Sequence, residues 1–112
     1  MAETTIVLET ITCKEPSEPL GDTIYINYII DGGRPERYPS KDGFPIKKNE
    51  SWRVNLALSF KETVSIELYE HDFPGSDDYL GTQNYRPIDP QPEGRQIRNK
   101  NGADYLLSTG SR

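Results

Sequence analysis

Strict alternation of apolar and polar residues along two consecutive segments is the feature that most limits how this chain can fold. In the first segment every second residue is apolar: Trp52, Val54, Leu56, Leu58 and Phe60. After the short sequence "KET", the same spacing returns at Val64, Ile66 and Leu68. A period of two is typical of a strand with one buried face, whereas a helix would place apolar residues three or four positions apart. The two segments therefore predict strands that pair as a β-hairpin.

Further short segments of the same kind predict an all-β protein. We expect strands at Thr4 to Cys13, Asp22 to Asp31, Tyr79 to Arg86 and Asp104 to Ser108. The Pro- and Gly-rich stretch between them is expected to hold one edge strand, at Arg37 to Tyr38 or at Phe44 to Ile46. The span "PIDPQPEGRQIRNKNG" predicts a long polar loop. The whole pattern indicates one domain over residues 1–112, a single antiparallel β-sandwich of seven or eight strands with a disordered tail at 108–112.

Charge and cysteine content narrow the class of protein. Residues 1–31 carry six acids and one base, and residues 62–85 carry six acids and no base, so nucleic acid is not expected as a ligand. The single cysteine, Cys13, leaves no internal disulfide. There is no apolar segment of membrane-spanning length and no basic, apolar leader. We therefore expect a soluble, cytoplasmic protein, with export that needs no signal peptide as the alternative.

The acidic segment "YEHDFPGSDDYLG" follows directly after a strand and indicates a site for a hard cation. If the strand through Leu68 continues, Glu70 and Asp72 point to its inward side and emerge at the mouth between the sheets. Converging carboxylates either stay apart in water, as in a solvated turn, or share a cation. Ca²⁺ suits them, since it takes roughly six to eight oxygen ligands in flexible geometry. An EF-hand is excluded because Pro74 and Gly81 occupy ligand positions of such a loop.

The same segment resembles part of a known family. "IELYEHDFPGSDDYLG" is similar to the strand and third calcium-binding loop of C2 domains, with Glu70, Asp72 and Asp78 at the spacing that this loop uses. "ITCKEPSEPLGDTIYINY" is similar to the first ligand loop, and "NESWRVNLALSF" resembles the strand that carries the family's conserved Trp. The resemblance implies a C2-like fold that binds Ca²⁺. It implies these ligands: Asp22, Glu70, Asp72 and Asp78, with Glu15 or Glu18 and Asp77 assisting.

The two acidic loops meet only if the strand directions allow it. One edge strand between Asp31 and Trp52 would bring the loop after Cys13 and the loop after Asp72 to the same end of the sandwich. The resemblance further implies docking to a membrane or partner surface through Phe73 and Leu20, with Lys47 and Lys48 attracting anionic lipid. Phe73 packing locally against Pro74 is the alternative.

Other functions remain as rivals. No nucleophile motif accompanies the single histidine, His71, and short loops leave little room for a substrate cleft, so we expect no enzyme. A metal-free adaptor that binds a protein through the basic middle segment or an edge strand is the main alternative. A carbohydrate-binding module with a structural calcium would need an exposed aromatic platform, with Tyr38, Tyr69 and Tyr85 as candidates.

Overall fold

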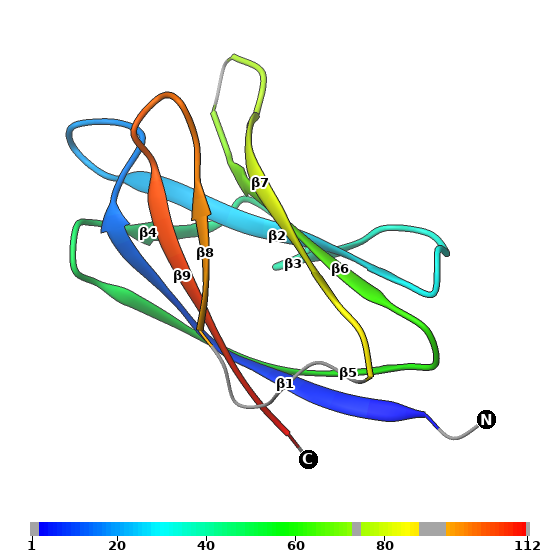
Figure 1. The fold of residues 1–112 in the computed structure, drawn as a ribbon. Coiled ribbons are helices and arrows are strands. Elements are labelled where there is room, and N and C mark those ends of the chain that lie inside the picture. Colours follow the sequence, from blue (N-terminus) through cyan, green and yellow to red (C-terminus); the bar gives the residue numbers. More distant parts are fainter. Residues whose placement is uncertain (1–2, 73–74, 88–93, 112) are drawn as a thin grey trace.

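A computed structural model describes residues 3–72, 75–87 and 94–111, and this part of the chain is built entirely of strands and their connections (Figure 1). In chain order the strands are β1 (Thr4–Glu15), β2 (Asp22–Ile30), β3 (Glu36–Tyr38), β4 (Phe44–Ile46), β5 (Ser51–Phe60), β6 (Val64–Glu70), β7 (Asp78–Tyr85), β8 (Gly94–Arg98) and β9 (Asp104–Ser111). They form two antiparallel sheets, which confirms the predicted all-β sandwich. The described residues hold nine strands, more than the seven or eight predicted from the sequence.

The two sheets share a buried apolar core. One sheet has the order β5-β1-β9-β8, and the other has the order β3-β2-β6-β7 with β4 also paired to β2. Apolar side chains from alternate positions of both sheets fill the space between them, as half-buried strands require. Cys13 belongs to this core and is fully buried. In this part of the chain no helix is long and apolar enough to cross a bilayer.

The predicted hairpin of β5 and β6 is wrong in its pairing, although both strands exist. β5 pairs with β1 in one sheet, and β6 pairs with β2 and β7 in the other. Both strands bury an apolar face in the same core, so their alternation is the same as that of two strands paired in a hairpin. The connection between them crosses from sheet to sheet and is held by Asp31, whose carboxylate accepts hydrogen bonds from the backbone N–H groups of residues 61–63.

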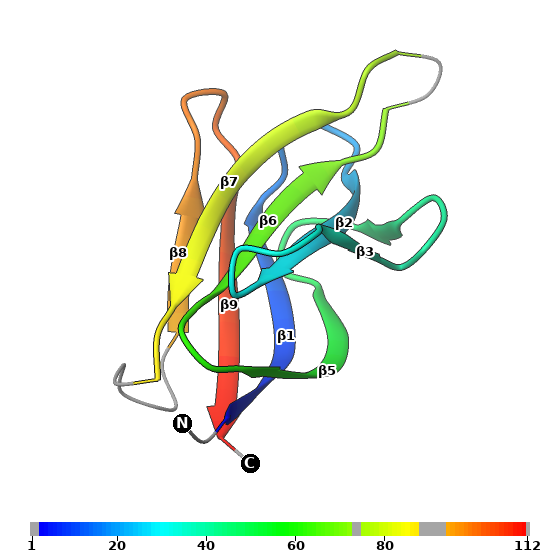
Figure 2. The same cartoon turned by 90° about the vertical axis from the view of Figure 1, so that its right-hand side faces the viewer.

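Both candidate edge strands are present, and together they act as one interrupted strand. β3 pairs with Tyr28 to Ile26 of β2, and β4 pairs with Ile24 to Asp22. Since both run antiparallel to β2, the strand directions alternate as the sequence argument required. As a result the β1–β2, β6–β7 and β8–β9 connections lie at one end of the sandwich, and β1 begins and β9 ends at the other (Figures 1 and 2).

Two predictions near the C-terminus are corrected. The expected long polar loop contains β8, which has a single buried apolar side chain, Ile97, and therefore shows no alternation that a pattern could detect. The expected disordered tail is part of β9 as far as Ser111, with the backbone of Ser111 opposite Ile6 of β1. Arg112 lies outside the described residues.

Candidate metal centre

Four carboxylates from two connections converge at the loop end of the sandwich. Glu18 belongs to the β1–β2 connection, Glu70 ends β6, Asp72 follows it, and Asp78 begins β7. One oxygen from each lies within 4.8 Å of the others. The two acidic segments, distant in sequence, thus meet as the strand directions predicted.

Glu70 is the buried member of this group. Glu70 is 4% exposed, and its Oε1 atom has no hydrogen-bond donor among the described residues; its side chain can hydrogen-bond to Glu18 when one of the two carboxyl groups holds a proton. Burial raises the pKa of Glu70 to about 8, and the neighbouring Glu18 and Asp22 carboxyl groups add to the effect. A buried carboxyl oxygen without a partner is costly, so this position favours either a proton or a bound cation.

A β-bulge brings Asp78 opposite Glu70. Leu68 pairs with Gly81, but the next pair joins Tyr69 to Tyr79, so Leu80 is the extra residue and Glu70 then faces Asp78. Gly81 has a φ of +152°, and a Cβ there would lie 2.5 Å from Cγ2 of Ile97. Only glycine therefore fits this position of the bulge without displacing β8.

Asp22 is not part of the converging group. It is 3% exposed, and both its oxygens accept hydrogen bonds inside the protein. Oδ1 accepts from the Ser17 hydroxyl (2.8 Å) and the Glu18 backbone N–H (3.1 Å); Oδ2 accepts from the Ser17 backbone N–H (2.8 Å) and the Tyr105 hydroxyl (2.5 Å). Asp22 thus folds the β1–β2 connection and holds the backbone of Glu18, the acid that reaches the cluster from this loop.

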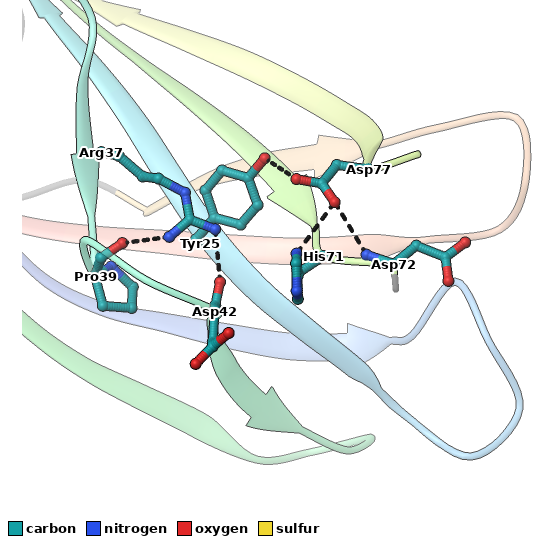
Figure 3. Close-up of polar contacts among 7 residues, drawn as sticks. All are labelled: Tyr25, Arg37, Pro39, Asp42, His71, Asp72 and Asp77. Carbon is teal, nitrogen blue, oxygen red and sulfur yellow. Dashed lines mark hydrogen bonds and ion pairs between the residues drawn. The ribbon is translucent and has the colours of Figure 1, made fainter. Parts of the chain in front are cut away.

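Asp77 also lies outside the group, because its carboxylate faces the other side of β7. Oδ2 accepts the Tyr25 hydroxyl at 2.5 Å, and Oδ1 lies 3.1 Å both from the Asp72 backbone nitrogen and from Nδ1 of His71 (Figure 3). The hydrogen bond from Tyr25 is the main cause that lowers the pKa of Asp77, and burial raises the pKa of Tyr25 to about 12. His71 contacts Asp77 and is not a member of the converging group.

The residues predicted to contact a surface lie beside the cluster. Leu20 is 90% exposed, and it lines an open pocket of about 500 Å³ together with Glu18, Lys47 and Lys48. Glu15 is not in the acidic group, since its carboxylate pairs with Lys48 at 3.5 Å. Phe73 lies outside the described residues, as does Pro74.

No protein-family model matches this sequence, and none of the curated proteins matches it. Solved structures, however, match its fold. The C2A domain of plant extended synaptotagmin 1 has a TM-score of 0.58 at 9% identity, covering 96% of this chain and 92% of that one. Another structure described as a C2 domain has a TM-score of 0.58 at 12% identity over the full length of both chains. The fold is C2-like.

A third match involves a larger protein. Human GIVD cytosolic phospholipase A2, solved with an inhibitor and terbium chloride, has a TM-score of 0.58 at 11% identity. The match covers 99% of this C2-like chain but 18% of the phospholipase chain. At such identities the likeness concerns the fold alone, so what this C2-like domain binds has to be argued from its own residues.

The aromatic residues considered for a carbohydrate platform do not form one in this C2-like domain. Tyr85 is fully buried, so it cannot contribute to an exposed face. Tyr38 stacks on Trp52 at 5.9 Å between ring centroids, whereas Tyr69 stacks on Tyr25 at 5.3 Å. Tyr85 is therefore excluded as a candidate, and Tyr38 and Tyr69 belong to separate aromatic stacks.

Three residues that organise the acidic loops were missed in the sequence: Ser17 and Tyr105, which hold Asp22, and Tyr25, which holds Asp77. No sequence pattern could connect the two tyrosines to their aspartates, because they are 83 and 52 residues away from them. The chemistry of the converging group itself is clear. Four carboxylates without a histidine or cysteine among them form a donor set for a hard, oxygen-seeking cation such as Ca²⁺.

Proposed function

We propose that this C2-like domain is a non-catalytic calcium-binding module that docks to a protein or anionic membrane surface under the control of Ca²⁺. The observation that carries the proposal is the buried carboxyl group of Glu70: its Oε1 atom has no hydrogen-bond donor in the described part of the chain, and one of its oxygens lies within 4.8 Å of three further carboxylates. We assign Glu18, Glu70, Asp72 and Asp78 as the ligands. Asp22, Glu15 and Asp77 are not assigned as ligands, because each is engaged elsewhere.

The mechanism is electrostatic. Without a cation, carboxylates this close repel one another, and Glu70 is kept protonated by its burial. Glu18 of the β1–β2 loop and Glu70, Asp72 and Asp78 around the β6–β7 loop would hold a divalent cation, which would supply positive charge in place of that proton and offset the repulsion. The end of the domain then becomes less negative, which lets Lys47, Lys48 and the exposed Leu20 approach an anionic surface.

Thermal unfolding tests the calcium-binding step. A ligand that binds only the folded state stabilises it by about 2.7 kcal/mol at a hundredfold excess over its Kd. We expect millimolar Ca²⁺ to raise the Tm above its value in EDTA, and Asp72→Asn to remove most of that gain while leaving the Tm in EDTA nearly unchanged. Asp42→Asn is the matched control, since Asp42 is exposed, lies away from the cluster and has a positive φ that asparagine tolerates. A Tm that is the same in Ca²⁺ and EDTA would contradict the proposal.

A second candidate is a metal-free adaptor, and two features favour it. Tyr38, Phe44 and Trp52 line an open pocket of about 520 Å³ between the β3–β4 connection and β5. Among the residues that the structure describes, β5 is an edge strand paired with β1 alone, so it offers backbone groups to an added strand. An adaptor of this kind would bind its partner equally in Ca²⁺ and in EDTA, which separates it from the calcium-dependent module.

A further inference from the structure

Two adjacent acids at the start of β7 have different surroundings. Side chains alternate along a strand, so Asp78 points towards the carboxylate cluster and Asp77 points to the outer face of the sheet. Leu80 and Tyr79 continue the same alternation, with Leu80 buried and Tyr79 55% exposed. The resemblance found in the sequence implied Asp78 as a ligand and Asp77 as an assisting one, whereas the structure places the two on opposite faces.

The carboxylate of Asp77 is occupied by contacts that shape its own loop. Oδ1 lies 3.1 Å from the backbone nitrogen of Asp72 and 3.1 Å from Nδ1 of His71, both on the far side of the loop. Oδ2 accepts the Tyr25 hydroxyl at 2.5 Å from β2. One side chain therefore joins the two arms of the β6–β7 connection and ties them to a neighbouring strand.

Tyr25 is held firmly enough to serve as the fixed point of this contact. It is 6% exposed and stacks on Tyr69 of β6 with 5.3 Å between ring centroids and 8° between ring planes. On the other side of its ring lies the guanidinium of Arg37, 3.7 Å from the centroid. That guanidinium also donates to the carbonyl oxygens of Pro39 and Asp42, so it too is fixed (Figure 3).

We infer that Tyr25 and Asp77 are positioning residues that hold Asp72 and Asp78 at the spacing a divalent cation needs, and that Asp77 itself is not a ligand. The inference deepens the proposed function and rests on it. Residues that orient ligands typically contribute a factor of roughly 10 to 100 to metal affinity. Asp77 also contacts the Asp72 backbone nitrogen and His71, whereas Tyr25 reaches the loop through its hydrogen bond to Asp77. Removing Tyr25 should therefore cost little more once Asp77 is already lost.

Isothermal titration with CaCl₂ tests the inference on wild type, Tyr25→Phe, Asp77→Ala and the double variant. We expect each of the three to bind with a Kd raised about tenfold or more and with unchanged stoichiometry, and the double variant to bind with nearly the Kd of Asp77→Ala. Tyr69→Phe is the matched control, because its ring keeps the stack while its hydroxyl faces Glu67 (3.4 Å) and not the loop. Asp78→Asn, which alters a ligand, should weaken binding further than Tyr25→Phe.

A wild-type affinity retained in Tyr25→Phe would overturn the inference, and so would strictly additive losses in the two single variants, because Tyr25 would then act independently of Asp77. Absence of Ca²⁺ binding by wild type would instead refute the proposed function. A measurement in EDTA keeps the two apart: solvent exchange of the Asp72 amide, followed by NMR. That amide should be protected in wild type and in Tyr69→Phe and should exchange several-fold faster in Tyr25→Phe; equal rates would overturn the positioning role without reference to any metal.

Discussion

Replacing Glu70 by glutamine should stabilise the metal-free domain, although it removes a ligand. Burial raises the pKa of Glu70 from the ordinary 4.5 to about 8, so at pH 7 the folded protein holds this proton while the unfolded chain has lost it. Folding must therefore take up a proton at pH 7, which over the 2.5 pH units above 4.5 costs about 3 kcal/mol. Glutamine has the same shape and no proton to take up.

Because the pKa of Glu70 is raised on folding, the stability difference between the variant and wild type should depend on pH in a distinctive way. For an acid whose pKa is raised on folding, the folded state binds more protons, so its contribution to stability is greatest below about pH 4.5 and falls as the pH rises to about 8. The difference between Glu70→Gln and wild type should be small at pH 4 and should grow to about 3 kcal/mol at pH 7. For a domain of this size that corresponds to a Tm roughly 10 °C higher.

Circular dichroism melts in EDTA between pH 4 and pH 8 measure this difference. Glu67→Gln is the control, because Glu67 lies on the same strand with opposite parity, and surface changes of this kind usually stay within about 0.5 kcal/mol. The reasoning would be refuted if Glu70→Gln were less stable than wild type at pH 7, or if the difference did not change with pH. The same variant should lose most of the calcium-dependent gain in Tm.

Three further outcomes follow from the contacts of the site. Asp22→Asn should lower the free energy of unfolding by about 2 kcal/mol in urea titrations, because an amide cannot accept on both sides, yet calcium should still raise the Tm. Gly81→Val should cost about 1–3 kcal/mol by the same measurement, since its Cβ would meet Ile97. Leu20→Ser combined with Lys47→Gln should reduce calcium-dependent co-sedimentation with phosphatidylserine vesicles several-fold while leaving calcium affinity unchanged; undiminished sedimentation would exclude this face as the docking surface.

The sequence was informative about which residues face the core and less so about which strands are neighbours. Alternation identified the buried faces of β5 and β6 correctly, because burial imposes a period of two on any strand. Alternation shows which side chains of a strand are buried, but it does not show which sheet the strand joins. For this reason the sequence pattern wrongly placed β5 and β6 in one hairpin. The sequence pattern did not predict β8, because only Ile97 of its five residues is buried and no alternation results.

The acidic cluster could be predicted in part. The parity of β6 carried Glu70 to the inward side, and the edge strands between β2 and β5 brought the two loops to one end. Which of the remaining acids belong to the cluster and which are hydrogen-bonded elsewhere could not be predicted. Asp22 and Asp77 are taken out of the cluster by hydroxyl groups of Tyr105 and Tyr25, and such contacts exist only once the chain has folded.

The most direct test of a shared cation site is a titration of ¹⁵N-labelled protein with CaCl₂, followed by amide chemical shifts. We expect saturable shifts in residues 15–22 and 70–79 together, because one ion would contact both loops, with little change in β5 or in the β3–β4 connection. A spectrum that does not change up to several millimolar Ca²⁺, or shifts confined to one of the two loops, would contradict the shared site.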